Sequence, residues 1–156
     1  MSRTAEITLP FGTEERTFRL GLGELRAVQE KCDAGPGELA QRIAPIVRAI
    51  RAKFTLADVL AGGMMGNWRV DDVREPILQG LIGGGMTPTD AGVLVRSVFD
   101  PRPLALEHMQ IAFAVLTAGY LPPEDEPQEA AEAPAGEPRP VRRRRRSPKA
   151  RSTSET

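Results

Sequence analysis

The sequence of 156 residues contains one cysteine, Cys32, and one histidine, His108. A single thiol can form neither an internal disulfide nor a metal site made of several cysteines, and it indicates a reducing compartment, the cytoplasm. A Ser–His or Cys–His catalytic pair would have to use His108, so the sequence offers no catalytic residue and favours a protein that is not an enzyme. No run of about 18 apolar residues is present, and the first residues lack the apolar stretch of a signal peptide, so we expect no contact with a membrane.

The charge is zero overall, with 21 basic and 21 acidic side chains, but it is unevenly distributed. Residues 122–137 hold only acidic charges, and residues 138–156 hold basic charges with a single acid. Residues 122–156 also have one large aliphatic side chain, Val141, and no aromatic one. Such a segment cannot bury enough apolar surface to offset the entropy lost on ordering. We therefore predict an ordered domain over residues 1–121 and a disordered, charged C-terminal tail over residues 122–156, called the C-terminal segment below.

The first ordered residues have the alternation of a β-hairpin. Ile7, Leu9 and Phe11 share one face of a strand over residues 6–11, and Phe18 and Leu20 share one face of a second strand over residues 17–20. The polar residues 12–15 between them predict the turn. Because a two-stranded hairpin is only marginally stable alone, its apolar face requires helices to pack against it.

Helical periodicity follows from about residue 22. It predicts helices over residues 22–32, from Pro36 to Phe54 with a kink or break at Pro45, and over 55–62 after a capping box formed by Thr55 and Asp58. Further helices are predicted from Asp71 or Asp72 to residue 82, over 88–99 after Thr87, and over 104–118. The fold class is α+β and mostly α, with the short N-terminal β-hairpin packed on a small helical domain of about five helices.

Two clusters imitate ligand sites. Residues 83–85 are three glycines, but the lysine of a phosphate-binding loop is missing, so we interpret them as a joint between helices. Asp71, Asp72 and Glu75 lie in the first turns of a predicted helix, where carboxylates are expected from the helix dipole, and the spacing of a calcium loop is missing. We therefore expect no metal and no cofactor.

Other residues suit a protein partner. Cys32 and His108 fall on apolar helix faces and are interpreted as buried structural residues. Flexible methionines and an aromatic side chain are typical of adaptable contact surfaces. The candidate partner-binding residues are Met64, Met65, Trp68 and Met86, of which the methionines are expected to be exposed. For Trp68 a place in the core is the alternative.

A run of arginines gives the C-terminal segment a candidate polyanion-binding site, made of Arg142, Arg143, Arg144, Arg145 and Arg146. No aromatic residue lies among them for base stacking, so the run predicts at most a weak, salt-sensitive contact with nucleic acid. The alternatives are contact with the acidic block of the same segment or with an acidic partner.

Three stretches carry a resemblance to a known family. They are LGLGEL at residues 20–25 followed by QEKCDAGP at 29–36, VDDVRE at 70–75 followed by GLIGGGM at 80–86, and DPRPL at 100–104. Over roughly residues 5–121, the chain resembles the tail assembly chaperones of tailed phages and gene transfer agents, a family also described as a tail tube family.

The resemblance implies a non-enzymatic assembly role. Such a chaperone binds the tape-measure protein, keeps it soluble, and gives way to tail-tube subunits; it acts in the bacterial host cytoplasm and is not expected in the mature particle. The alternatives are a structural tail (tube) component and, less favoured, a nucleic-acid-binding protein that uses its arginine run. Self-association is a further expectation.

Overall fold

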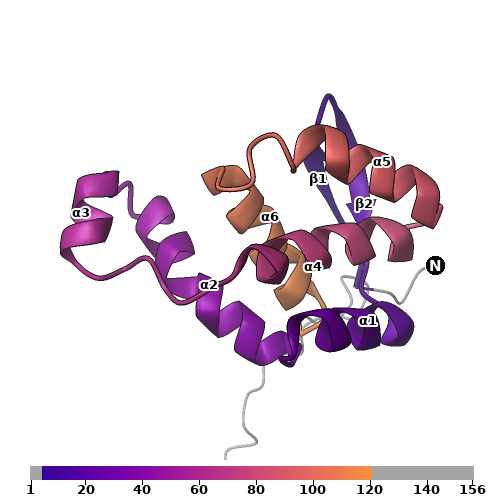
Figure 1. The fold of residues 1–156 in the computed structure, drawn as a ribbon, viewed down its shortest axis with the longest axis horizontal. Coiled ribbons are helices and arrows are strands. Elements are labelled where there is room, and N and C mark those ends of the chain that lie inside the picture. The colour runs from indigo at the N-terminus through magenta and orange to yellow at the C-terminus, as the bar shows by residue number, and fades with distance from the viewer. Residues whose placement is uncertain (1–4, 121–156) are drawn as a thin grey trace, which may run out of the picture. The chain divides into compact units, whose positions relative to one another are not determined.

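The computed structural model describes residues 5–120, which form a mostly helical α+β domain (Figure 1). The elements in chain order are β1 (Ile7–Phe11), β2 (Glu14–Phe18), α1 (Leu22–Cys32), α2 (Pro36–Arg51), α3 (Leu56–Ala61), α4 (Val70–Gly83), α5 (Pro88–Val98) and α6 (Leu106–Ala118). The predicted fold class is confirmed, with six helices in the described part rather than about five. None of these helices has the length and apolar character that a membrane crossing needs. The expectations for the C-terminal segment lie outside the described residues.

The hairpin is tighter than its sequence suggested. β1 and β2 pair antiparallel from Ile7 opposite Phe18 to Phe11 opposite Glu14, so the loop is only Gly12 and Thr13. Gly12 has φ 75°, a conformation that two-residue hairpin loops require and that glycine adopts without strain. The predicted turn over residues 12–15 and second strand over 17–20 were therefore wrong, because the ladder resumes directly after the loop and ends before Leu20.

α4 lies at the centre of the domain. It packs against α1, α5, α6 and β2, while α2 packs along α6 (Figure 1). The hairpin contributes Phe11 and Phe18 to the core, with ring centroids 6.1 Å apart in an edge-to-face arrangement. The predicted alternation of β1 is confirmed, since Phe11 is buried and Ile7 and Leu9 pack against the core.

Two prolines lie inside helices without breaking them. α2 continues through Pro45, so of the predicted kink or break the break is wrong, and α4 continues through Pro76. In α2, buried side chains on both sides of the proline, among them Ile43 and Ile46, hold the helix against α6. Tertiary packing thus compensates for the backbone hydrogen bond that each proline removes.

Other helix ends differ from the prediction because the periodic pattern of apolar residues continues beyond the residues that are helical. Phe54 and Leu104 were placed in apolar stripes, but both lie outside helices and are 49% and 64% exposed. α4 begins at Val70 with Arg69 as its N-cap, so neither Asp71 nor Asp72 is the cap residue. The predicted caps Thr55 and Thr87 are confirmed.

The glycines at the end of α4 form the predicted joint and also allow a close approach. Gly84 is the C-cap, and the carbonyl of Gly80 accepts a hydrogen bond of 3.0 Å from the Arg19 backbone N–H. A Cβ on Gly83 would overlap the carbonyl oxygen of Arg19, and a Cβ on Gly84 would overlap that of Thr17. The backbone around the end of β2 therefore lies directly against the end of α4, which only glycine permits.

This contact predicts opposite effects of alanine at two glycines. Gly84→Ala should lower the free energy of unfolding by about 1–3 kcal/mol, because the hairpin must shift away from α4. Gly23→Ala in α1 is the matched control, since a Cβ there meets nothing within 4 Å. It should raise stability by up to about 1 kcal/mol through helix propensity. Urea unfolding measures both, and equal effects would contradict the close packing.

Candidate protein interface

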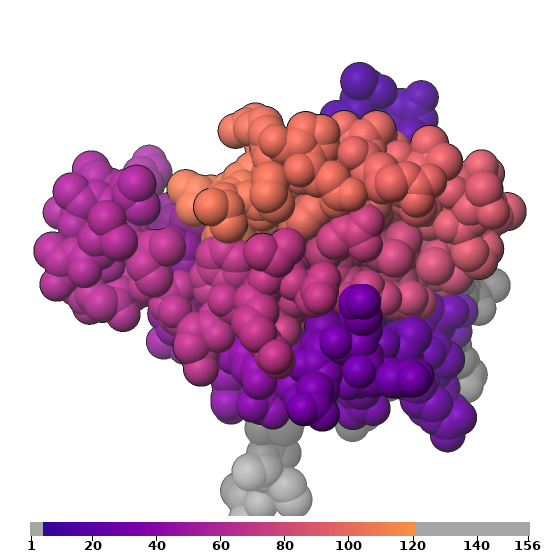
Figure 2. All heavy atoms as spheres, viewed as in Figure 1, coloured from indigo at the N-terminus to yellow at the C-terminus, as the bar shows by residue number. Residues whose placement is uncertain are grey.

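Residues 52–69, called the arm below, link α2 to α4 and carry α3 away from the rest of the domain. Figure 2 shows the part of this segment around α3 as a separate lobe beside the body. Three of its apolar side chains face solvent, with Phe54 49%, Leu56 61% and Leu60 60% exposed. The arm is therefore the place in the described residues where apolar side chains gather on a projecting segment, as is typical of a protein interface.

Local chemistry forms α3 in the absence of broad packing. The Thr55 hydroxyl accepts a hydrogen bond from the Asp58 N–H at 3.2 Å, and the Asp58 carboxylate accepts one from the Thr55 N–H at 3.0 Å. The hydrogen bonds from Thr55 lower the pKa of Asp58 below its usual value. Leu56 and Leu60 are one turn apart and share a face, while Val59 is the buried residue of α3. A six-residue helix is too short to persist alone, so it depends on its base.

Half-buried side chains form that base. Met64, Met65 and Trp68 all pack against the core, and the Trp68 indole N–H donates to the Met65 carbonyl at 2.9 Å. The structure thus brings three of the four candidate partner-binding residues together, but as partly buried anchors of the arm rather than as exposed side chains. Met86 lies apart from them, between α4 and α5. Their partner-binding role stays a prediction.

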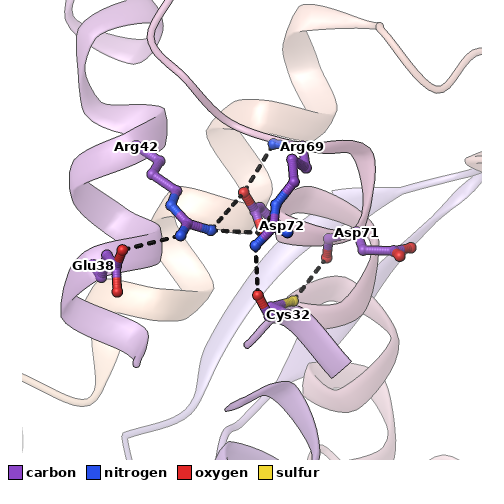
Figure 3. A network of polar contacts seen from close by, with 6 residues as sticks. All are labelled: Cys32, Glu38, Arg42, Arg69, Asp71 and Asp72. Carbon is purple, nitrogen blue, oxygen red and sulfur yellow. Dashed lines mark hydrogen bonds and ion pairs between the residues drawn. The ribbon is translucent and has the colours of Figure 1, made fainter. Parts of the chain in front are cut away.

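A polar network fixes the arm where it joins α4 (Figure 3). The Asp72 carboxylate is fully buried and accepts hydrogen bonds from Arg42 of α2 at 3.2 and 3.3 Å and from the Arg69 backbone N–H at 2.8 Å. The Arg69 guanidinium donates to the Cys32 carbonyl at the end of α1 at 2.7 Å, and Arg42 also donates to Glu38 at 3.0 Å. Asp72 and its partners therefore join α1, α2 and α4 at the root of the arm.

The carboxylates considered as a metal site serve separate purposes. Asp72 belongs to the network, Asp71 is exposed, and Glu75 accepts a hydrogen bond from Gln79 at 3.1 Å. Residues 5–120 contain no group of three or more His, Cys, Asp or Glu side chains that could hold a metal ion.

Cys32 is buried, as predicted. Burial raises the pKa of its thiol to about 12, assisted by the negative charges of Asp72, Glu75 and Asp71. The thiol donates to the Asp71 carbonyl at 3.3 Å. A thiol with so high a pKa is not a nucleophile at neutral pH.

His108 is also buried, as predicted. Its ring stacks on Phe99 with centroids 4.9 Å apart and meets the edge of Phe11 at 6.0 Å. Burial lowers its pKa below the usual value, and its Nδ1 has no hydrogen-bond partner among the described residues. The ring also lines a hollow of about 530 Å³ between β1 and α6. The candidate residues Arg142 to Arg146 lie outside the described part of the chain.

Sequence reasoning missed Phe54, Leu56, Leu60 and the role of Asp72. The first three were assigned to buried stripes or left unnoticed, because a periodic pattern does not show which helix lacks a neighbour. The Asp72 network depends on Arg42, which lies 30 residues earlier in the chain. No local signal connects the two.

Removing the Asp72 charge should destabilise the domain strongly. Asp72→Asn leaves Arg42 facing a neutral amide in a mostly buried site, so the free energy of unfolding should fall by about 3 kcal/mol. Asp71→Asn is the control, because the Asp71 side chain is exposed, and it should change stability by less than about 0.5 kcal/mol. Denaturant titration compares the two variants, and similar small losses would show that the network contributes little.

Burial of His108 predicts a pH dependence with a defined sign. Because its pKa is lowered in the folded state, the unfolded chain binds more protons near the ordinary value of about 6.5. Stability should therefore fall as the pH decreases from about 7 to 5, with a slope of at most about 1.4 kcal/mol per pH unit. His108→Gln should remove this slope. Asp58 loses its stabilising charge only at lower pH, so the two effects separate in urea unfolding measured at several pH values. An unchanged slope in His108→Gln would contradict the assignment.

Comparison with known families gave a match over the whole described domain. Residues 4–121 match the family described as "Phage tail tube protein, GTA-gp10". Comparisons with curated proteins and with solved structures gave no match.

Proposed function

Because the chain belongs to the phage tail tube protein, GTA-gp10, family, we propose that it is a structural component of the tail of a phage or gene transfer agent. The single observation that carries this proposal is the family match over residues 4–121, which spans the whole described domain. In this role the protein acts by binding other tail proteins and not by catalysis.

The arm supplies the surface for that binding. Phe54, Leu56 and Leu60 expose about half of their surface or slightly more, and covering the exposed part of one such side chain contributes on the order of 1 kcal/mol. The Asp72 network and Trp68 hold the base of the arm, so little conformational freedom is lost when a partner binds. Apolar exposure on a pre-positioned segment favours a protein partner over a small ligand.

A second candidate function is that of an assembly chaperone for the tape-measure protein. The chaperone would keep that long helical protein soluble in the host cytoplasm, and tail-tube subunits would then replace the chaperone. The chemistry of the arm favours it. Met64 and Met65 follow α3 in the chain and stay partly exposed, and unbranched, polarizable side chains adapt to apolar helices of varied sequence.

The composition of purified particles separates the two functions. A structural component should be found by quantitative mass spectrometry in a fixed ratio to the other tail proteins. A chaperone should be missing from particles and should co-purify with the tape-measure protein from lysates of producing cells. Absence from particles would overturn the structural role.

The arm should matter in either role. Replacing Leu56 and Leu60 together by serine should lower the yield of tailed particles at least severalfold, because the exposed apolar face is lost while the core is untouched. Leu22→Ser is the matched control, since Leu22 is 66% exposed on α1. Particle counts by electron microscopy measure the effect, and equal yields from both variants would remove the arm from the proposal.

A further inference from the structure

The hollow of about 530 Å³ between β1 and α6, called the β1–α6 hollow below, runs along the edge of a strand. Four consecutive residues of the hairpin, 9–12, line it, and none of β2 does. Side chains of consecutive strand residues point to opposite faces, so a hollow that touches four in a row meets the strand at its edge. Because β2 pairs with the other edge of β1, the hollow lies along the free edge (Figure 1).

The register of the hairpin shows which backbone groups lie at this free edge. Because the loop has two residues, Phe11 and Glu14 exchange hydrogen bonds, and in an antiparallel ladder such pairs alternate with pairs that exchange none. Thr8 and Pro10 belong to pairs of the second kind, and both are exposed. The N–H and C=O of Thr8 and the C=O of Pro10 therefore point away from β2.

The opposite edge of the hairpin is already covered. Thr17 stands opposite Thr8 in the register, and its carbonyl oxygen lies against Gly84 at the end of α4. The backbone N–H of Arg19, just beyond β2, donates to the carbonyl of Gly80 at 3.0 Å. The backbone of Thr8 has no such partner within residues 5–120, so the edge of β1 can accept a further strand.

The wall opposite the free edge suits apolar side chains. His108, Ile111 and Ala114 line it from one face of α6, since they recur at every third position. Val98 of α5 closes the end of the hollow near the tip of the hairpin. A strand laid along β1 would turn every second side chain toward this wall, on the face that Leu9 and Phe11 also use.

The charge at the hollow is positive. Arg51, at the end of α2, lines the hollow with its guanidinium 5.6 Å from the centre of the Phe113 ring. It takes part in no ion pair within residues 5–120. The acidic residue of the lining, Glu107, lies 3.6 Å from Arg102, which compensates its charge. A carboxylate on the incoming segment would complement Arg51.

We propose that the β1–α6 hollow binds an extended, acidic segment of another tail protein, which adds to the free edge of β1 as a third strand. The segment places alternate apolar side chains against α6 and a carboxylate beside Arg51. A row of free backbone groups next to an apolar wall recognises a strand rather than a small ligand, because hydrogen bonds and side-chain contacts then form together. The proposal rests on the proposed function and deepens it by stating the chemistry of the partner.

A second copy of the chain is a poor source of this segment. In the described residues its strands hold apolar side chains such as Phe11 and Phe18 in their own core. Two β1 edges also pair poorly with each other, because Pro10 has no N–H to donate. The C-terminal segment offers one large aliphatic side chain, Val141. A separate protein is therefore the occupant to test.

Amide hydrogen exchange of the full chain with a synthetic peptide tests the proposal. The probe is a short peptide of alternating valine and threonine with a glutamate near one end. Its binding should slow exchange of the Thr8 amide at least about tenfold, because that N–H gains an acceptor. The Leu9 amide, which already faces β2, is the internal reference. The same peptide with N-methylated backbone amides cannot add as a strand and should not bind.

Two substitutions at one position separate strand addition from other contacts. Thr8→Pro removes the N–H at the free edge, where Pro10 already lacks one, so the hairpin should still form. It should weaken binding of the probe at least about tenfold, whereas Thr8→Val retains the N–H and should bind like the wild type. Thermal unfolding verifies that both variants are folded.

Charge reversal tests the acidic contact. Arg51→Glu should weaken binding of the glutamate peptide about fivefold or more and strengthen binding of a lysine version by a similar factor. Arg48→Glu is the matched control, because Arg48 is exposed on the same helix but does not line the hollow. It should leave the preference for glutamate unchanged.

Several outcomes would overturn the proposal. They are a probe that does not bind, equal binding by Thr8→Pro and Thr8→Val, and a preference for glutamate that Arg51→Glu does not reverse. Wild-type dimers that Thr8→Pro abolishes would also overturn it, because the occupant would then be a second copy. The structural role would survive any of these outcomes, because the composition of particles is measured independently.

Discussion

The arrangement of the helices depends on one buried carboxylate. Asp72 has no exposed surface and would be costly to bury alone, yet Arg42 and the backbone N–H of Arg69, the N-cap of α4, compensate its charge. The same residue therefore starts α4, ties it to α2, and through Arg69 holds the end of α1. The ion pair therefore fixes the end of the arm that joins α4, while the arm leaves α2 after Arg51, well beyond Arg42.

Features set by neighbouring residues could be predicted from the sequence. The caps at Thr55 and Thr87 and the end of α4 at the glycines all follow from side chains or backbone freedom within a few positions. The predicted start of the second strand was wrong because the positive φ of Gly12, which allows a two-residue loop, was not inferred from the sequence. The polar Glu14 and Glu15 looked like loop residues because both are exposed, although they belong to β2.

Features set by tertiary contacts could not be predicted. Nothing local shows that Gly83 and Gly84 touch the backbone of the hairpin, or that Asp72 meets Arg42. The candidate site likewise combines features that the sequence indicates with features that depend on tertiary contacts. Composition drew attention to Met64, Met65 and Trp68, and the packing shows that they are half-buried anchors of the arm. The exposed leucines of α3 follow the same periodicity as buried ones, so exposure depends on whether another helix covers them.

The way in which α3 is attached separates the proposed binding surface from the folding core, although the two usually share residues in a small domain. α3 contributes one side chain, Val59, to the core, and its shape comes from its own cap and from the turns that flank it. Under the proposed function, substitutions on its outer face would change what the protein recognises with little effect on whether it folds. Related chains can thus diverge in this segment and acquire new binding specificity while the rest of the domain stays constant.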